Sequence, residues 1–195
     1  MTIVENLKEN TGKVTLAGLL ITSSLILSGG FYFFINEAHA AAAISSGKDT
    51  LSIPTPGSNT NHTIQFVSPT GAGDTTDTIT ITFPAGFSLT GIIEDDIDIE
   101  EDTTGAVGDC ASFATEKVTA ASAGLTDWGV GIADQVITLT HPTDGANQDI
   151  AVGACIQIKI GTNAVDSGTG VNQINNPSKS AGVGTADIPS ITIAG

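Results

Sequence analysis

TITITF, the stretch from Thr78 to Phe83, alternates polar and apolar side chains with a period of two. In an extended strand this period places Ile79, Ile81 and Phe83 on one face and the threonines on the other. A helix would distribute the same side chains around its circumference, because its period is 3.6 residues. The stretch therefore predicts a β-strand with one buried face.

The same alternation recurs along the chain after residue 48 and predicts about eight strands. The other strands are marked by these apolar residues: Leu51 and Ile53; Ile64 and Phe66; Ile97 and Ile99; Trp128, Val130 and Ile132; Ile137 and Leu139; Ile156, Ile158 and Ile160; Ile191 and Ile193. Runs of Gly, Pro, Asp, Asn, Ser and Thr lie between them, and these residues favour turns. Gly129 and Gly131 alternate within one strand, which indicates a closely packed neighbouring backbone or a bulge.

The spacing of these strands also predicts how they pair. Residues 111–123 offer at most one or two helical turns, and a parallel sheet would need crossover helices. About 155 residues follow the N-terminal segment, which is enough for one domain and too few for two. We expect an all-β fold, an antiparallel immunoglobulin-like β-sandwich of about eight strands, over residues 41–195.

The chain begins with a hydrophobic targeting segment, residues 1–40. Val14 to Ile35 runs for 22 residues without a charge, and as a helix it would measure about 33 Å and span a hydrocarbon core. Ala38 and Ala40 form the small-x-small pattern that signal peptidase accepts, so we expect a signal peptide cleaved after Ala40. An uncleaved membrane anchor is the alternative, because the apolar run exceeds the usual core of about 7 to 15 residues. Either way, residues 41 onward are expected to be extracellular or at the cell surface.

The chain is strongly acidic, with a net charge of −15. Residues 1–40 hold three of its 21 acidic residues and two of its six basic ones, so residues 41–195 carry a net charge of −14. This composition argues against nucleic acid as a partner and leaves contact with a membrane to the N-terminal segment, because phosphate groups need basic patches. The charge fits solubility, cation binding or spacing between neighbours at a surface.

Cys110 and Cys155 are the two cysteines of the chain, and both lie in the part expected to be exported. An oxidising compartment permits a disulfide, and only one intramolecular pairing is possible. The bond would close a loop of about 46 residues and stabilise the fold by about 4 kcal/mol on the loop-entropy model. Two buried free thiols are the alternative.

Residues 94–102 read EDDIDIEED and hold seven acidic side chains in nine positions. In a strand, Asp96, Asp98 and Glu100 would share one face, and clustered carboxylates are ligands that Ca²⁺ prefers. The segment nevertheless lacks the glycine and the bidentate glutamate of an EF-hand loop. The alternative is a solvated edge strand whose charges repel neighbouring strands. Calcium is the one cofactor that the sequence suggests.

The sequence shows no catalytic machinery. His62 and His141 are the histidines that follow the N-terminal segment, and neither has metal-ligand spacing to another histidine or to a cysteine. His141 takes the alternation position that Phe83 holds in its own strand, so we expect it to be half-buried and structural. No serine lies in a nucleophile-elbow pattern, and a single tryptophan provides few platforms for sugar rings. We therefore expect that the protein is not an enzyme.

Five segments together resemble the immunoglobulin-like domains of large, uncharacterised bacterial surface proteins. They are TITITFPAGF (78–87), DWGV (127–130), QVITLTHPTD (135–144), IQIKIGTNA (156–164) and NQINNPS (172–178). The resemblance covers roughly residues 50–195 and brings no catalytic residues with it. It implies a domain that follows a signal peptide and precedes further β-sandwich modules. The end of the sequence directly after an expected strand fits the first part of a longer protein.

These features predict a non-enzymatic exported module, structural or adhesive, that acts as a stalk, a spacer or a binding domain of a larger surface protein. Its partners would be other surface proteins or further domains of the same protein. One alternative is a subunit of a surface filament or lattice, in which an exposed strand such as Asp49 to Ile53 adds to a neighbour's sheet. The other alternative is a calcium-dependent binding domain.

Overall fold

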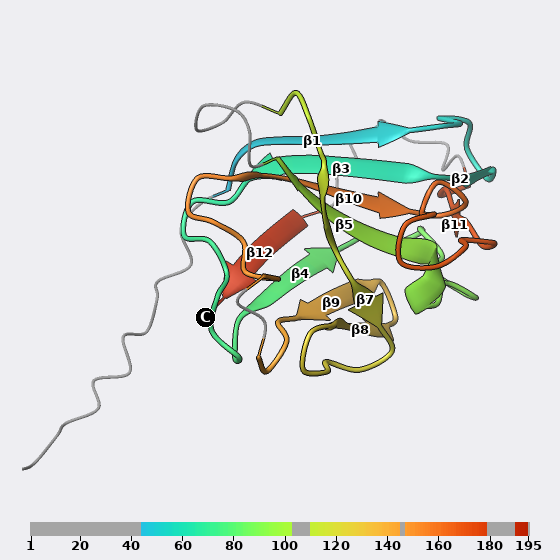
Figure 1. Ribbon diagram of the computed structural model, residues 1–195. Helices are drawn as coiled ribbons and strands as arrows, with labels where there is room; N and C mark the ends of the chain where they lie inside the picture. The colour runs from blue at the N-terminus through green and yellow to red at the C-terminus, as the bar shows by residue number, and fades with distance from the viewer. Residues whose placement is uncertain (1–43, 103–109, 145–146, 179–189, 195) are drawn as a thin grey trace, which may run out of the picture. The chain divides into compact units, whose positions relative to one another are not determined.

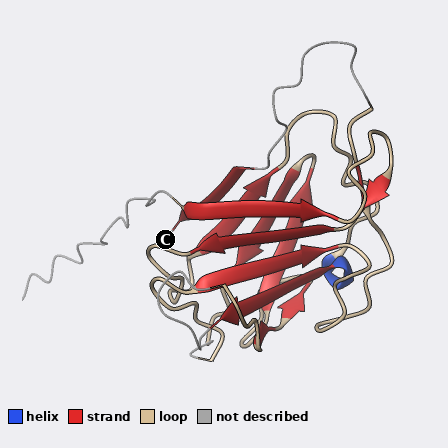
Figure 2. Ribbon diagram, turned by 90° about the horizontal axis from the view of Figure 1, so that it is seen from above, coloured by secondary structure: helices blue, strands red, loops and turns tan. Residues whose placement is uncertain are grey.

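Two five-stranded β-sheets make up most of the regular structure in the computed structural model (Figure 1, Figure 2). The structure describes residues 44–102, 110–144, 147–178 and 190–194, which all belong to one compact unit. The predicted targeting segment, with Ala38 and Ala40, lies outside the described residues. Within those residues, no helix has the length and apolar character needed to cross a membrane.

The first sheet is antiparallel throughout. Its strands, in order across the sheet, are β1 (Ser45–Leu51), β3 (His62–Val67), β10 (Cys155–Ile160), β5 (Ile97–Asp102) and β6 (Thr115–Lys117). β10 lies at the centre and pairs without interruption with β3 on one side and β5 on the other. β1 and β6 are the edges, and the register of β1 shifts between Ser45 and Lys48.

The second sheet is antiparallel except at one edge. Its strands, in order, are β12 (Ser190–Ala194), β4 (Thr78–Thr82), β9 (Val136–Thr140), β8 (Trp128–Ala133) and β7 (Thr119–Ala120). β7 pairs parallel with β8, and the other neighbours pair antiparallel. A short ladder of β2 (Asn59–Thr60) with β11 (Ile174–Asn175) and one 3₁₀ turn, η1 (Glu94–Asp96), complete the described elements.

The predicted alternation fills the space between the sheets. In β4, Ile79 and Ile81 are buried while the threonines beside them are not, and in β10 Ile156, Ile158 and Ile160 are buried in the same way. Apolar side chains of both sheets form a single cluster, which gives a sandwich-like arrangement around one core. Burial of each such side chain stabilises the fold by about 1.5–3 kcal/mol. For the residues that the structure describes, the prediction of an all-β fold with antiparallel sheets is confirmed.

Residues 111–123, for which the sequence allowed at most one or two helical turns, form none. The segment forms β6 in the first sheet and then β7 in the second, so the chain changes sheets at Val118. Lys117 pairs with Ile99 of β5, and Thr119 pairs with Trp128 of β8. Pairing with two existing strands outweighs the weak helix propensity of a segment rich in serine and threonine.

The close approach predicted at Gly129 is confirmed. A Cβ atom added to Gly129 in β8 would overlap the backbone nitrogen of Ala123 and lie 2.9 Å from its Cα atom. At Gly131, two residues along the same strand, the nearest atom to an added Cβ would be the carbonyl oxygen of Thr138 at 3.7 Å. Only the first glycine is therefore required by packing.

The first strand lies earlier in the chain than the sequence pattern indicated. A strand was expected around Leu51 and Ile53, but β1 ends at Leu51, and Ile53 is 44% exposed. The amide of Ile53 donates to the hydroxyl of Thr60 at 3.0 Å instead of to a carbonyl of β3. Pro54 follows and has no amide hydrogen for a ladder, so pairing cannot continue.

Candidate functional site

The acidic run lies inside the first sheet. Residues 94–96 form η1 and residues 97–102 form β5, which pairs with β10 on one side and β6 on the other. All six residues of β5 are buried, including Asp98, Glu100, Glu101 and Asp102. The interpretation as a solvated edge strand is therefore wrong. Buried carboxylates need internal hydrogen-bond donors, and the chain supplies them.

Asp96 holds two separated segments together. Its carboxylate accepts hydrogen bonds from the amides of Ile93 (3.0 Å), Val171 (2.7 Å) and Asn172 (2.8 Å), and from the side-chain amide of Asn172 (2.9 Å). Burial opposes ionisation, but the hydrogen bonds from Asn172, Ile93 and Val171 outweigh it and hold the pKa of Asp96 below its ordinary value. The ionised side chain thus fixes the loop before β5 to the loop after β10.

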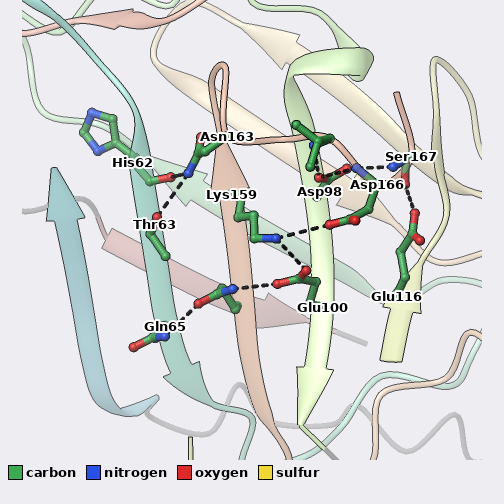
Figure 3. A network of polar contacts seen from close by, with 12 residues as sticks. His62, Thr63, Gln65, Asp98, Glu100, Glu116, Lys159, Asn163, Asp166 and Ser167 are labelled. Atoms are coloured by element: carbon green, nitrogen blue, oxygen red, sulfur yellow. Dashed lines mark hydrogen bonds and ion pairs between the residues drawn. The ribbon is translucent and has the colours of Figure 1, made fainter. Parts of the chain in front are cut away.

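Asp98 holds the same loop after β10 at an earlier position, residues 165–167. Its carboxylate accepts hydrogen bonds from three successive amides, those of Val165 (2.6 Å), Asp166 (2.9 Å) and Ser167 (2.9 Å). Figure 3 shows Asp98 on β5 facing Asp166 and Ser167. Three amides that converge on one carboxylate form a backbone nest for an anion, and here the anion belongs to the protein itself.

Glu100 takes part in a polar row on the face of the sheet that points away from the core (Figure 3). Gln65 donates to Gln157 (2.7 Å), Gln157 donates to Glu100 (2.6 Å), and Lys159 donates to Glu100 (2.6 Å) and Asp166 (3.1 Å). Burial opposes the charge on Lys159, but its hydrogen bonds to Glu100 and Asp166 outweigh this and raise its pKa. The hydrogen bond from Lys159, which outweighs burial, lowers the pKa of Asp166.

Glu101 lies on the opposite face of β5, the face of the core. It forms a 2.8 Å ion pair with Lys117 and accepts the amide of Ala151 at 2.8 Å. Lys117 also donates to the carbonyl of Asp149 at 2.6 Å, and the side chains of Glu101 and Lys117 are each only 2% exposed. This buried pair joins β5 and β6 to the segment before β10.

The predicted disulfide between Cys110 and Cys155 is confirmed, with 5.4 Å between the Cα atoms. Cys155 begins β10 and lies opposite Asp102, the last residue of β5. The carboxylate of Asp102 accepts the amides of Ala111 (2.9 Å) and Ser112 (2.7 Å), which directly follow Cys110. A covalent bond and a carboxylate therefore hold the same part of the chain against the sheet.

Of the three residues proposed as calcium ligands, Asp98 and Glu100 lie on one face of β5, and Asp96 lies in η1 directly before this strand. Asp96, Asp98 and Glu100 alternate with the buried isoleucines of β5. Their carboxylates already accept the hydrogen bonds given above, and a cation would have to displace these donors. Within the part of the chain that the structure describes, no three His, Cys, Asp or Glu side chains are placed to hold a metal ion. The geometry thus gives no support to calcium at this position.

Both histidines of the described ranges are buried. His141 lies 2.8 Å from the carbonyl of Pro142 and 3.1 Å from the carboxylate of Asp149, in line with the structural role that was expected, although it is buried more fully. His62 lies 2.7 Å from the carboxylate of Asp49. Asp49 was expected on an exposed strand, so the contact between Asp49 and His62 was not predicted.

The sequence did not reveal what the acidic residues contact. The main partners of Asp96 and Asp98 are backbone amides of residues 165–172, about 70 positions away in the chain, and an amide carries no residue-specific signal. The glycines of that segment are the one sequence feature that fits its close packing against the acidic run, because a Cβ added to Gly168 would lie 2.7 Å from the carboxylate of Asp95. The chain matches no protein-family model, no curated protein and no solved structure.

Proposed function

We propose that this protein is an exported, non-enzymatic surface module, structural or adhesive, whose domain is an immunoglobulin-like β-sandwich. The observation that carries the proposal is the Cys110–Cys155 disulfide. Disulfides persist in oxidising compartments such as the cell exterior, and this one agrees with the targeting segment predicted for residues 1–40. The two together support an extracellular or cell-surface localisation.

The polar interior supports a structural or adhesive role. The carboxylates of Asp96, Asp98 and Asp102 use their oxygens to hold loop backbone in place. Loops fixed in this way at the end of a rigid sandwich suit presentation of a surface to a partner, or spacing between domains. The partners would be other surface proteins or further domains of the same protein, with membrane contact only through the N-terminal segment.

The two packed sheets support the immunoglobulin-like assignment. They are largely antiparallel, and alternate residues of each sheet supply one shared core, which is the arrangement of that fold. The segment that passes from β6 to β7 contributes a strand to an edge of each sheet. Such a shared edge strand ties the two layers together.

Export can be tested on the full chain in a bacterial host. Intact cells would be treated with protease, and the protein would be probed for cleavage and for free thiols before and after reduction. We expect cleavage by external protease and thiol labelling only after reduction, while a cytoplasmic control protein stays intact. An intact-mass measurement would show whether Met1 to Ala40 has been removed. Protection from protease in intact cells, or free thiols without reduction, would contradict the proposal.

A filament or lattice subunit is the second candidate, and one observation favours it. β12 pairs with β4 in unbroken register and carries no charged side chain. Exposed strand edges of this kind accept further strands. β1, the edge suggested by the sequence, is less suitable, because its register shifts and Asp49 on it points toward buried His62. If β12 mediates assembly, Thr192→Lys should abolish concentration-dependent oligomers in sedimentation velocity, whereas Thr50→Lys on β1 should leave them unchanged.

A further inference from the structure

Three large apolar side chains are exposed on the loops beside η1. Ile93 is 43% exposed, Val165 is 59% exposed and Val171 is 68% exposed. We refer to Ile93, Val165 and Val171 as the apolar trio. Single exposed apolar residues are common on protein surfaces and need no explanation. The trio differs because of the way in which its backbone is held.

The backbone amide of each trio residue donates to a buried carboxylate of the acidic run. Ile93 and Val171 donate to the same carboxylate, that of Asp96, at 3.0 and 2.7 Å, and Val165 donates to Asp98 at 2.6 Å. Asp96 and Asp98 are both fully buried. The shared carboxylate brings the amides of Ile93 and Val171 close together, and Asp98 lies two residues further along the chain.

The two loops that carry the trio also contact each other directly. A Cβ atom added to Gly168 would lie 2.7 Å from the carboxylate of Asp95, so the loop after β10 packs against η1. Figure 1 shows the two segments at the same end of the first sheet. Exposed apolar side chains on an ordered backbone lose less conformational entropy when they bind than those on a mobile loop. The buried carboxylates of Asp96 and Asp98 thus hold the backbone of the three exposed apolar residues in place.

Acidic residues adjoin two members of the trio in the sequence. Glu94 and Asp95 follow Ile93 directly and Asp166 follows Val165, and all three retain solvent exposure. An apolar centre with a charged rim is the usual composition of a protein interaction surface. A negative rim favours a positive partner and disfavours a second copy of this chain, whose net charge is −15.

We propose that the apolar trio is a docking surface for a partner protein that presents apolar side chains ringed by lysine and arginine. The proposal rests on the proposed function, because it takes the domain to meet other proteins at the cell surface. Asp96 and Asp98 are positioning residues in this arrangement, since they hold the amides of the trio and do not touch the partner.

The test uses protein purified from exporting cells and two synthetic peptides. The first is an amphipathic peptide of leucine and lysine, and the second has glutamate in place of lysine. The test variant carries Ile93→Ser, Val165→Ser and Val171→Ser. The control carries Leu125→Ser and Val152→Ser, because these loop residues are at least as exposed as the trio, at 69% and 71%. Thermal unfolding of both variants would confirm that they are folded.

We expect the lysine peptide to shift the methyl resonances of the trio and to bind the triple variant about tenfold more weakly than the parent, since two or three anchoring side chains are lost. The Leu125 and Val152 control should bind like the parent, and the glutamate peptide should bind no protein measurably. Equal binding to the triple variant, equal binding of both peptides, or shifts centred on Leu125 and Val152 would overturn the proposal.

Two further outcomes have a defined meaning. Trio resonances that shift with protein concentration in the absence of peptide would overturn the proposal in favour of a second copy of the chain. Protease protection in intact cells would contradict the proposed function alone, because the peptide titration measures the surface of the purified protein. The two experiments can therefore fail independently of each other.

Discussion

At the scale of single residues, a few carboxylates hold whole loops, and Asp98 is the clearest case. It accepts three successive amides from residues 165–167. Asp98→Asn would place an amide group against these donors, and hydrogen bonds to charged groups contribute about 1.5–3 kcal/mol each. We expect urea denaturation to show a loss of about 2–3 kcal/mol in the free energy of unfolding. Asp95→Asn, at an exposed position three residues earlier in the chain, should change this value by less than about 0.5 kcal/mol.

Acid should destabilise the protein through the same kind of residue. The folded state lowers the pKa of Asp96 and Asp166, so folded protein binds fewer protons than unfolded protein near their ordinary value of 3.8. The stability that these groups contribute is fully present above pH 3.8 and is lost as the pH falls through the lowered values. The urea concentration at the unfolding midpoint, measured from pH 6 to pH 2, should decrease once the pH is below about 4. Asp96→Asn should make this decrease smaller. An unchanged acid dependence in that variant would show that Asp96 contributes none of it.

At the scale of elements, β8 allows a test with its own matched control. Gly129→Ala would place a methyl group against the backbone of Ala123, whereas Gly131→Ala would find its nearest atom at 3.7 Å. Overpacking that requires a backbone shift costs about 1–3 kcal/mol. We expect Gly129→Ala to lower the free energy of unfolding by this amount and Gly131→Ala to change it little. Similar losses in both variants would mean that the contact with Ala123 is not the cause.

The strands that could be predicted are those with clear alternation. Seven of the eight expected strands lie where they were predicted, and the first lies earlier in the chain, at Ser45–Leu51. A period of two between a core face and a polar face is a local signal that can be read from the sequence. The short elements β2, β6, β7 and β11 were not predicted, since two or three residues form a strand only when a partner strand already lies beside them. The disulfide could be predicted because two cysteines allow one pairing.

The contacts of the acidic strand could not be predicted for a different reason. Asp96, Asp98 and Glu100 were placed on one face of a strand by their spacing; Asp98 and Glu100 lie two residues apart in β5, whereas Asp96 lies in η1. Whether that face meets water, a cation or backbone depends on where the loop of residues 161–173 lies. That position is set by contacts across 60 to 80 residues of chain, among them the amide of Val165 on Asp98 and that of Val171 on Asp96. The edge-strand interpretation failed at this point.

At the scale of the whole molecule, the carboxylates accept hydrogen bonds from the protein itself, which predicts that calcium does not change its thermal stability. A calcium ion that bound with a dissociation constant of about 0.1 mM would stabilise the fold by about 2.7 kcal/mol at 10 mM calcium. We expect the melting temperature to be the same in 10 mM calcium and in chelator, at constant ionic strength. Magnesium at the same concentration is the control for general screening of the negative charge. A rise with calcium alone would restore the calcium-dependent binding domain.

The disulfide also determines how the domain would respond to a pulling force. β1 begins the first sheet and β12 ends the second, so tension between the two ends of the domain loads one layer against the other. Cys110 and Cys155 are 45 residues apart in the chain, and the loop they close contains β6 to β9. Because that loop cannot extend while the bond is intact, stretching an oxidised molecule should release about 150 Å less chain than stretching a reduced one. Single-molecule force measurements with and without reductant would record this difference. Under a sudden load, an oxidised domain would unfold without its chain reaching full extension.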